Sequence, residues 1–493
     1  MLLNLSKSQY IRGLKCPLSL WLYKNRRDIE RVTTEKNQQI MSGGQEVGEL
    51  AQKLYPEGTL ISEDYTQIGN AIQSTQDAVK NGASVLFEAT AATPEGDYSR
   101  IDIFQKVPKT DEWDMIEVKS STRVADYYIE DIAFQRHVFE EAGYKIRKSI
   151  LTHINSDYLR QGELDLDQLF TQADLTEEAK SRKTQITSNI ENLNNIVGGK
   201  EPNTQIGARC NKDNECDYSH HCWKHIPDYS IFNIGRFTKK WDCYNKGIIK
   251  VEDIYNHYDL LNPKQLIEVE SYKNNQVHIE KDKIRKFLDQ LEYPLYYLDY
   301  ETTSSAIPPY DKTCPYQQIP FQFSLHIQKE KDAELEHIEF LHEENNDPRP
   351  AMIHKLIENC GKSGSIIVYN IVFERSHVNE KLIQQFPEYE AEISSINERM
   401  IDLLVPFSNR FIYHPAMKGS ASIKSVLPAF VPELSYKDLE IQNGGMAPQE
   451  YLRTFSQEVS PKKRKKIFNN LKLYCGLDTM AMVRLMDVLK KAI

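Results

Sequence analysis

The stretch Leu295-Tyr-Tyr-Leu-Asp-Tyr-Glu301 predicts a buried β-strand that carries two carboxylates. Asp299 and Glu301 stand two residues apart, so both side chains leave the same face of such a strand. Burying the pair without a cation is costly, because each charge loses its hydration. An isolated Asp-x-Glu pair is usually a solvated strand face. A divalent metal ion is the alternative that the surrounding apolar residues favour.

Three further segments follow this strand in a fixed order. They are Ile366-Ile-Val-Tyr-Asn-Ile-Val-Phe-Glu374, Met400-Ile-Asp-Leu-Leu404 and Tyr474-Cys-Gly-Leu-Asp478. The last segment is predicted to be helical, and a spacing of four places its phenol and its carboxylate on one helix face. For Asp402, the sequence leaves two roles open, an acidic group near the site or a helix N-cap.

The ordered series resembles the DEDD exonucleases, the RNase H-like class of 3′–5′ exonucleases, in the variant whose last motif carries tyrosine. The resemblance covers roughly residues 293–493. It implies that carboxylates bind the metal ions and that Tyr474 orients the attacking water. In the second motif, Glu374 stands where that class normally has aspartate. The implied metal ligands are Asp299, Glu301, Glu374 and Asp478, all with catalytic roles, and the implied nucleic-acid contact is Asn370.

The segment 419–446 resembles an insertion typical of an uncharacterised bacterial family that joins two nuclease-like halves. We expect Lys424 and backbone amides of this segment to bind the end of a strand. The alternative is a surface loop of ordinary turn chemistry. The basic tract Lys462–Lys466 is usually a solvated helix start, and beside the last motif it is a second candidate for phosphate neutralisation.

The first half of the chain carries a second carboxylate constellation. Glu117 and Lys119 stand two apart on a predicted strand, and Asp102 is expected to end a neighbouring strand of a hairpin. Carboxylate oxygens are hard ligands for Mg²⁺ or Mn²⁺, and a lysine can position the metal-bound water or steady the phosphate charge. Taken alone, Glu-Val-Lys is more often an exposed strand of alternating charge.

Motifs across roughly residues 8–225 resemble RecB-like nucleases of the PD-(D/E)XK superfamily, in the iron–sulfur branch found in CRISPR adaptation nucleases and AddAB-type helicase–nucleases. The motifs are Gln9–Leu22, Gly44 to Ala51, Arg100–Asp102, Glu117–Ser121 and Asp131–Gln135. The resemblance implies that Asp102 and Glu117 bind metal and that Lys119 is the catalytic lysine. It also implies that Gln135, with Tyr128, contacts the DNA backbone. Glu88 is a further acidic candidate, and Glu49 follows Gly48 where many relatives have a metal-binding histidine.

Four cysteines are candidate ligands of a metal centre: Cys16, Cys210, Cys216 and Cys222. Zinc is the simplest occupant of a four-cysteine site, and His220 or His221 would then be further candidate ligands. Cys16-Pro followed by an aromatic helix favours a [4Fe–4S] cluster instead. Such a cluster would clasp the two ends of the first domain. The remaining cysteines are expected to be buried small hydrophobic residues: Cys243, Cys314, Cys360 and Cys475.

The composition predicts a soluble protein of several domains. The 493 residues are 40% hydrophobic and 27% charged, with a net charge of −10. No apolar run is long enough to span a bilayer, and the first residues have no secretory layout, so a cytoplasmic protein without membrane partners is expected. We expect an α/β fold in three parts: a PD-(D/E)XK restriction-endonuclease-like nuclease domain (1–228), a helical connector (229–290) and an RNase H-like exonuclease domain (291–493).

The function expected from these observations is a metal-dependent DNA nuclease with two hydrolytic sites, a [4Fe–4S] cluster and Mg²⁺ or Mn²⁺. Its substrates would be single strands or frayed ends in DNA repair, recombination or phage defence. RNA is the alternative polymer, because nothing in the sequence reads a 2′-hydroxyl. A second alternative is a weakly active end-binding subunit that serves a helicase, CRISPR or other defence complex.

Overall fold

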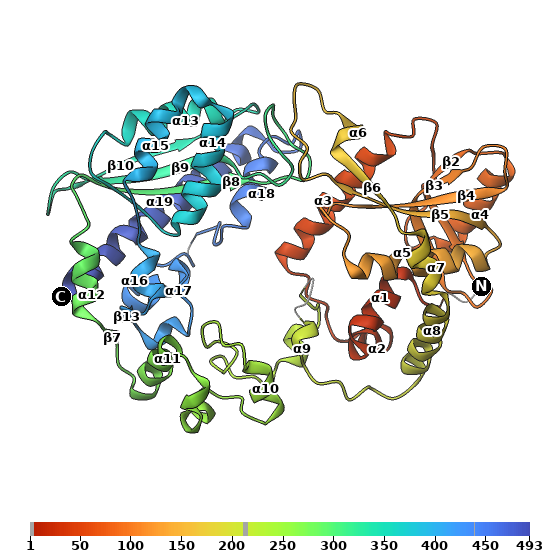
Figure 1. Cartoon of the computed structure of the whole chain (residues 1–493), viewed down its shortest axis with the longest axis horizontal. Helices are drawn as coiled ribbons and strands as arrows, with labels where there is room; N and C mark the ends of the chain where they lie inside the picture. The colour runs from red at the N-terminus through yellow and green to blue at the C-terminus, as the bar shows by residue number, and fades with distance from the viewer. Residues whose placement is uncertain (1–3, 211–214, 438) are drawn as a thin grey trace. The chain divides into compact units, whose positions relative to one another are not determined.

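A computed structural model describes residues 4–210, 215–437 and 439–493 (Figure 1). The protein is a mixed α/β structure, as the sequence predicts. The chain forms two compact units. Unit 1 contains residues 1–224 and 305–316, and unit 2 contains residues 225–304 and 317–493. Among the described residues, no helix combines the length and the apolar character needed to cross a membrane.

Unit 1 is built on a six-stranded sheet with strand order β1-β2-β3-β4-β5-β6. The strands β2, β3 and β4 form an antiparallel meander, and α5 then crosses over so that β5 pairs parallel with β4. The two strands expected around Asp102 and Glu117 are β3 and β4 of this sheet. The strands are β1 (Thr59–Leu60), β2 (Val85–Ala92), β3 (Tyr98–Lys106), β4 (Glu112–Lys119), β5 (Lys145–Ile154) and β6 (Phe170–Asp174).

The helices of unit 1 pack on this sheet through aromatic residues. Phe104 on β3 stacks on Trp113 of β4 with ring centroids 4.4 Å apart, and Tyr10 stacks on Phe134 of α5 at 4.6 Å. The strand β6 pairs antiparallel with β5 and extends the sheet. The helices are α1 (Lys7–Lys15), α2 (Pro17–Asn25), α3 (Glu35–Gln52), α4 (Ile68–Lys80), α5 (Asp126–Glu141), α6 (Leu166–Leu169), α7 (Thr176–Ser181), α8 (Lys183–Gly198) and α9 (Ser219–Cys222).

Unit 2 contains a five-stranded sheet with strand order β10-β9-β8-β11-β12. The strands β8, β9 and β10 are antiparallel, whereas β11 runs parallel to both β8 and β12. The strand β8 is central and is the strand predicted from the opening stretch of sequence. The strands are β8 (Leu295–Thr303), β9 (Ile319–Gln328), β10 (Leu335–Leu341), β11 (Ser365–Val368) and β12 (Met400–Asp402).

Helices cover both faces of this sheet (Figure 1). Successive side chains of β8 point to opposite faces of the sheet. Tyr296 and Leu298 pack in one core with α13 and α15, whereas Leu295 and Tyr297 pack in another with α19. The odd-numbered residues of β8 therefore face α19. The helices are α13 (Arg349–Asn359), α14 (Glu380–Gln385), α15 (Glu390–Glu398), α16 (Leu404–Ser408), α17 (Ile423–Phe430), α18 (Met446–Arg453) and α19 (Pro461–Lys491).

The segment 229–290, expected as a helical connector, is counted within unit 2. Its short helices enclose a core of their own around Tyr229, Ile231 and Val269. The strand β7 (His278–Ile279) pairs with β13 (Ile412–Tyr413), which adds a two-stranded sheet. The helices of the segment are α10 (Lys240–Asn245), α11 (Pro263–Asn274) and α12 (Lys281–Leu288).

Candidate metal and catalytic sites

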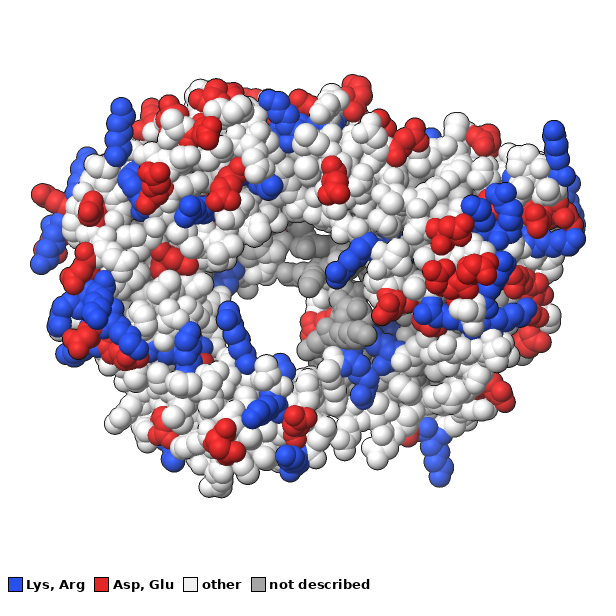
Figure 2. All heavy atoms as spheres, in the orientation of Figure 1, with Lys and Arg blue, Asp and Glu red and all other residues white. Residues whose placement is uncertain are grey.

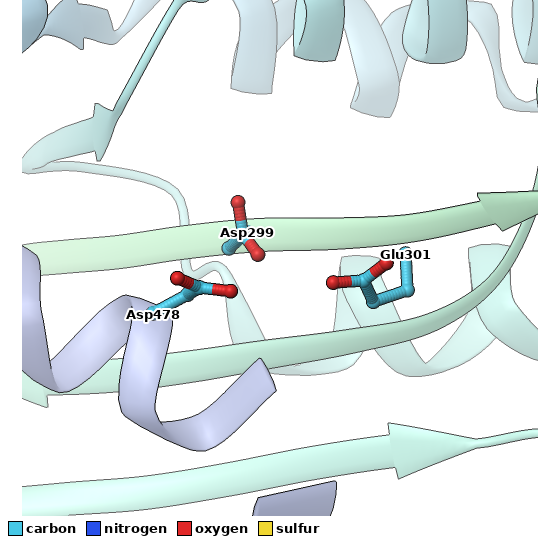
Figure 3. Close-up of side chains that lie close together, drawn as sticks. All are labelled: Asp299, Glu301 and Asp478. Carbon is cyan, nitrogen blue, oxygen red and sulfur yellow. The ribbon is translucent and has the colours of Figure 1, made fainter. Parts of the chain in front are cut away.

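Three carboxylates meet in unit 2 between β8 and α19 (Figure 3). One oxygen each from Asp299, Glu301 and Asp478 lies within 4.8 Å of the others. In the part of the chain that the structure describes, this is the one cluster of three or more Asp, Glu, His or Cys residues with such convergence. Both strand residues have odd numbers, so the alternation of β8 turns them toward the helix that carries Asp478.

Burial makes these carboxylates difficult to ionise. Desolvation, together with the neighbouring carboxylates, raises the pKa of both Asp299 and Glu301 well above the usual value. Desolvation also raises the pKa of Asp478, to about 6, although hydrogen bonding and Lys424 oppose the shift. The cluster therefore either holds protons or requires a cation. Three oxygen donors within a few ångströms are a ligand set that fits Mg²⁺ or Mn²⁺.

Two tyrosines and a lysine complete this site. Lys424 of α17 donates a 2.8 Å hydrogen bond to the phenol oxygen of Tyr474. The hydroxyl of Tyr436 donates to Asp478 Oδ1 at 2.5 Å. Desolvation and the nearby carboxylates raise the pKa of both phenols, so both stay protonated at neutral pH. The segment 419–446 thus contributes contacts inside the site, with a role for Tyr436 that the sequence did not reveal.

Glu374 lies in the helical turn η4 (Val372–Asn379), close to this cluster but outside the three converging oxygens. The side chain is 2% exposed, and its Oε2 has no hydrogen-bond partner among the described residues. Desolvation, followed by the charge of Asp299, raises its pKa well above the usual value. A buried carboxylate oxygen without a donor is consistent with a ligand for a cation near Asp299.

Asn370 and Asp402 shape the turn that leads into η4. The backbone of Asn370 is in the left-handed region, with φ of 96°, a conformation that asparagine tolerates better than most residues. Its N–H donates to Asp402 Oδ1 at 3.0 Å, and the N–H of Leu404 donates to the same oxygen at 2.9 Å. The N-cap position of α16 is Leu403, so Asp402 is not the N-cap of that helix, and its charge contributes to the raised pKa of Glu374.

The carboxylates predicted in unit 1 are also brought together. Ile103 on β3 pairs with Ile116 on β4, and this register places Asp102 beside Glu117. Asp102 Oδ2 accepts a 2.6 Å hydrogen bond from the N–H of Val118. Contrary to expectation, Asp102 lies inside β3 rather than at its end, because the strand continues to Lys106. Desolvation, followed by the charge of Glu117, raises the pKa of Asp102 to about 8.

Two ammonium groups contact Glu117, and only one was predicted. Lys119 Nζ lies 2.5 Å and Lys7 Nζ lies 2.6 Å from the same oxygen, Glu117 Oε1. The carboxylate of Asp131 on α5 forms ion pairs with both lysines. Its oxygens lie 2.9 Å from Lys119 Nζ and 3.5 Å from Lys7 Nζ. Burial alone would raise the pKa of Asp131, but the two lysines outweigh it and lower that pKa. Charge in this cluster is therefore neutralised by the protein itself.

Gln135 and Tyr128 border the same cluster. Gln135 is fully buried, and its Nε2 donates to Glu117 Oε2 at 2.8 Å and to Asp131 Oδ1 at 3.2 Å. Its Oε1 has no hydrogen-bond partner among the described residues. Lys119 Nζ lies 5.5 Å from the ring centroid of Tyr128. The structure thus places Gln135 as a support of the carboxylates.

A cavity of about 510 Å³ opens beside Asp102. Gly48, Glu49 and Glu88 also line it, so the predicted metal ligand Asp102 shares this cavity with two glutamates and with the glycine of the histidine position. Glu88 has a φ of 58°, and Arg100 lies 3.8 Å from its carboxylate. Desolvation raises the pKa of Glu88. The cavity thus offers three carboxylates to a cation or to the water around it.

The four clustered cysteines line a single cavity of about 520 Å³ in unit 1: Cys16, Cys210, Cys216 and Cys222. Cys16 separates α1 from α2, and Cys222 ends α9. Desolvation and the other three thiols raise the pKa of Cys222 to about 11. Residues 211–214 lie outside the described part of the chain. A metal that binds thiolates would remove this cost of ionisation. Four cysteines are the number of donors that a [4Fe–4S] cluster or a zinc ion takes, and no three of these described sulfurs lie within 4.8 Å of one another.

Other contacts also hold the cysteine segment to the N-terminal helices. Arg12 of α1 forms a 2.8 Å ion pair with Asp217 and donates to Ser19 of α2. Of the other cysteines, three are buried as expected, and Cys314 is half-buried. Cys475 lies with its sulfur 3.9 Å from Asp299 Oδ2, which places a thiol beside the carboxylate site.

Comparisons with known proteins leave the activity unassigned. Residues 296–422 match a family described as a domain of unknown function, DUF2779. The chain is 29% identical over 243 residues to an uncharacterized protein of Ureaplasma parvum, a match covering 45% of this chain and 35% of the relative. Uncharacterized proteins of Mycoplasma pneumoniae and Mycoplasma genitalium are 26% and 27% identical, covering 41% and 43% of this chain. The matches span about a third of the length of each relative. No solved structure matches the chain.

Proposed function

We propose that the protein is a metal-dependent DNA nuclease with two phosphodiester-hydrolysing sites. The observation that carries the proposal is the cluster of half-buried Asp299 with buried Glu301 and Asp478. Among the described residues no lysine or arginine forms an ion pair with these oxygens, and their pKa values stay raised despite the charge of Lys424, which makes a bound cation favourable. Pairs of divalent ions held by such carboxylates activate a water and stabilise the leaving oxygen in phosphodiester hydrolysis.

The topology of each unit supports this reading. In unit 2 an antiparallel meander is followed by two parallel strands, with the carboxylate strand in the centre, as the RNase H-like resemblance implies. In unit 1 the meander β2-β3-β4, the crossover helix α5 and the parallel strand β5 carry Asp102 and Glu117 on adjacent strands, as the PD-(D/E)XK resemblance implies. Fold alone does not establish function, so the proposal depends on the side chains.

The residues of unit 2 suit hydrolysis in specific ways. The phenol oxygen of Tyr474 accepts a hydrogen bond from Lys424, and its own proton is donated toward Asp478, so this phenol links the lysine to a carboxylate of the cluster. Tyr436 fixes the orientation of Asp478 through the 2.5 Å bond to Oδ1. Glu374 supplies a further buried oxygen near Asp299. These groups hold a water and a scissile phosphate against the carboxylates.

In unit 1 the expected roles fall to Asp102, Glu117 and Lys119, with the four cysteines as a structural clasp. A divalent metal, when bound, would lower the pKa of a coordinated water. Lys119 is placed to steady the phosphate charge as that water attacks. A [4Fe–4S] cluster would bind the cysteines of the α1–α2 boundary and of the segment 210–222, so its loss would loosen this unit.

One observation favours the second candidate, an end-binding role, for unit 1. Glu117 Oε1 is contacted by both Lys7 and Lys119, and ammonium groups compete with a metal ion for the same oxygen. Such a unit would bind DNA ends for a helicase, CRISPR or defence complex and leave cleavage to unit 2. RNA remains the alternative substrate for unit 2, because the site has no group assigned to a 2′-hydroxyl.

The deciding experiment is digestion of end-labelled single-stranded DNA and RNA with Mn²⁺ by protein purified without oxygen. We compare wild type, Asp299→Asn, Lys119→Ala and the double variant, with Asp332→Asn as a control for an exposed aspartate. Loss of cleavage only in Asp299→Asn assigns the activity to unit 2. Loss only in Lys119→Ala assigns it to unit 1. Unchanged digestion by the double variant would refute the proposal, and so would the absence of cleavage by wild type.

A further inference from the structure

Unit 2 contains a cavity of about 700 Å³ that is not lined by Asp299, Glu301 or Asp478. It lies where the segment 229–290 packs on the helices that follow β12. Glycines, asparagines, serines and three basic residues predominate in its lining.

A buried ion pair forms the back wall of this cavity. Arg410 donates from Nε and Nη2 to Glu268 Oε1 at 2.9 and 2.5 Å, and both side chains are almost fully buried. Arg410 also donates to the carbonyl of Gly419 at 2.8 Å, while Glu268 Oε2 accepts from the N–H of Gly235 at 2.8 Å. A bidentate pair with its remaining donors satisfied is rigid and electrically neutral.

Close backbone contact locks the two walls together. Gly419 has a φ of 78°, and a Cβ at this position would lie 1.9 Å from the carbonyl oxygen of Asn233. A Cβ on Gly235 would approach Glu268 Oε1 to 2.7 Å. Both positions therefore require glycine, and the loop that carries Arg236 is fixed against the loop before α17.

Two cations in the lining have no acidic partner. Arg236 is exposed, and Lys264 donates to the amide oxygen of Asn409 at 2.7 Å. Neither is in an ion pair among the residues that the structure describes. Lys, Arg, Asp and Glu are interspersed over the face of the protein shown in Figure 2. In a chain with a net charge of −10, two unpaired cations beside a neutral wall mark a local preference for an anion.

The cavity adjoins the carboxylate site through two shared elements. Tyr369 and Asn370 line it, and the same turn continues into η4, which carries Glu374. Ile423 also lines it, and the next residue of α17, Lys424, reaches Tyr474. The start of α17, where Ser422 makes no side-chain cap, opens onto the cavity and adds partial positive charge.

We propose that this cavity, which we call the backbone pocket, binds phosphates of a single strand next to the phosphodiester that unit 2 cleaves. The inference rests on the proposed nuclease function and adds a substrate-binding role for the segment 229–290. Arg236 and Lys264 would contact phosphates, and Asn262 and Asn370 would donate to sugar or phosphate oxygens. Because these contacts read the backbone, the pocket accepts DNA and RNA strands alike.

The test measures binding of fluorescent dT6 and rU6 to the full chain with Asp299→Asn and Lys119→Ala, which prevents cleavage. Arg236→Asn and Lys264→Gln together remove both charges, and asparagine tolerates the φ of 53° at position 236. The matched control is Lys239→Gln with Lys246→Gln, two exposed lysines of the same segment. Thermal unfolding checks that all variants fold alike.

We expect Arg236→Asn/Lys264→Gln to weaken binding of both oligonucleotides at least 5-fold relative to the control. The slope of log K against log salt should fall by up to about 1.4, since each lost phosphate contact on a single strand accounts for about 0.7. With the cleavage sites restored, KM for dT6 should rise while hydrolysis of the dinucleotide dT2 stays unchanged. A dinucleotide has one phosphodiester, which is the bond that is cleaved, so it offers no neighbouring internucleotide phosphate to the pocket.

Affinity and salt slope equal to those of the control would overturn the assignment. The two proposals fail in different ways. If wild type cleaves no nucleic acid while Arg236→Asn/Lys264→Gln still weakens oligonucleotide binding, the hydrolytic function is wrong and the assignment of the backbone pocket stands. If wild type cleaves and Arg236→Asn/Lys264→Gln binds and cleaves like the lysine control, the phosphate-binding role of the pocket is wrong and the nuclease function stands.

Discussion

The two units carry carboxylate clusters of similar composition that stabilise their charge in opposite ways. In unit 1, Lys7 and Lys119 contact Glu117 and Asp131 directly, and they lower the pKa of Asp131 despite its burial. In unit 2, the cluster of Asp299, Glu301 and Asp478 has hydroxyl and thiol neighbours, and its pKa values are raised. Two ammonium groups thus contact the carboxylates of unit 1 directly, whereas in unit 2 the charge of Lys424 does not offset the effect of burial.

The difference has a consequence for metal binding. A metal ion that enters unit 2 relieves repulsion among carboxylates, so its binding stabilises the folded state. A metal ion that binds Glu117 in unit 1 must displace or share an oxygen held by two lysines. We therefore expect unit 2 to bind Mn²⁺ more tightly than unit 1.

The largest effect is expected from Asp299→Asn. The change removes one of three converging oxygens that hold the metal, so cleavage assigned to unit 2 should fall by at least about 100-fold, a loss of about 2.7 kcal/mol in transition-state stabilisation. The rise in unfolding temperature that Mn²⁺ gives wild type should be lost. Differential scanning calorimetry with and without Mn²⁺ measures the second effect.

Without metal, the same variant should unfold at a higher temperature than wild type, because a neutral amide removes repulsion and desolvation cost. Asp332→Asn, on an exposed residue with a φ of 62°, should change neither property. If Asp299→Asn keeps the Mn²⁺-dependent stabilisation, Asp299 is not a metal ligand. The expected difference in Mn²⁺ binding between the two units would then lose its basis.

The second prediction concerns the cysteine clasp of unit 1. Cys222→Ser should abolish the visible absorbance of an iron–sulfur cluster and lower the unfolding temperature of unit 1 while leaving that of unit 2 unchanged. The reason is that metal binding at four thiolates contributes directly to folding. Cys314→Ser, which alters a cysteine outside the four, is the control.

Metal analysis of the anaerobic protein separates the two occupants that fit the four sulfurs. About four irons per chain identify the cluster, and one zinc identifies the tetrahedral site. If neither metal is present and Cys222→Ser is as stable as wild type, the cysteines do not form a clasp.

The periodicity of strands and helices made part of each site predictable. A spacing of two on β8 and of four on α19 indicates which side chains share a face, and the alternation of apolar neighbours indicates burial. Lys7 and Tyr436 escaped prediction for a different reason. Lys7 meets Glu117 across 110 residues, and Tyr436 meets Asp478 across 42. Such contacts depend on how helices pack on a sheet, and no local spacing encodes that packing.

The fold shows the same limit. The central strands were predictable because their apolar runs are long and rich in β-branched and aromatic residues. The short strand β6 was not, because the polar sequence around Phe170 carries only a weak strand signal and is stabilised by pairing with β5. Asp102 was placed at the end of its strand for a similar reason, since strand ends depend on pairing rather than on local sequence.

The third prediction is a pH dependence that should appear in unit 2 when the protein is stripped of metal. The folded-state pKa of Asp478 is about 6, and those of Asp299 and Glu301 are also raised above their unfolded values. The native state thus binds more protons than the unfolded state between about pH 4 and pH 6 or above. Stability is fully present below about pH 4 and is lost as pH rises through the folded-state values.

Each unit of pKa difference corresponds to about 1.4 kcal/mol, so the decline should amount to a few kcal/mol. Urea unfolding of EDTA-treated protein at pH 5 and pH 8, followed by a probe in unit 2, measures it. Saturating Mn²⁺ should remove the decline, because the metal takes the place of the protons. A metal-free unit 2 that is equally stable at both pH values would show that its carboxylates are not coupled in the folded state.

The smallest effect is expected from Lys7→Met, which tests whether the ammonium group of Lys7 competes with a metal ion in unit 1. Methionine keeps the length of the side chain but removes the ammonium group 2.6 Å from Glu117. One competing positive charge is then lost, so Mn²⁺ should bind unit 1 several-fold more tightly, an effect of about 1 kcal/mol for a partly screened charge. Any cleavage assigned to unit 1 should nevertheless fall, because Lys7 also fixes the carboxylate.

Electron paramagnetic resonance of Mn²⁺ with Asp299→Asn protein isolates binding at unit 1, and Lys15→Met, at the other end of α1, is the control. Lys7 and Cys16 lie at opposite ends of this one helix, so loss of the clasp should also displace the ammonium group. Lys7→Met and Cys222→Ser should therefore change Mn²⁺ affinity in the same direction and less than additively when combined. Weaker Mn²⁺ binding by Lys7→Met would mean that Lys7 assists the metal site instead of competing with it, and that would reverse the contrast between the two units.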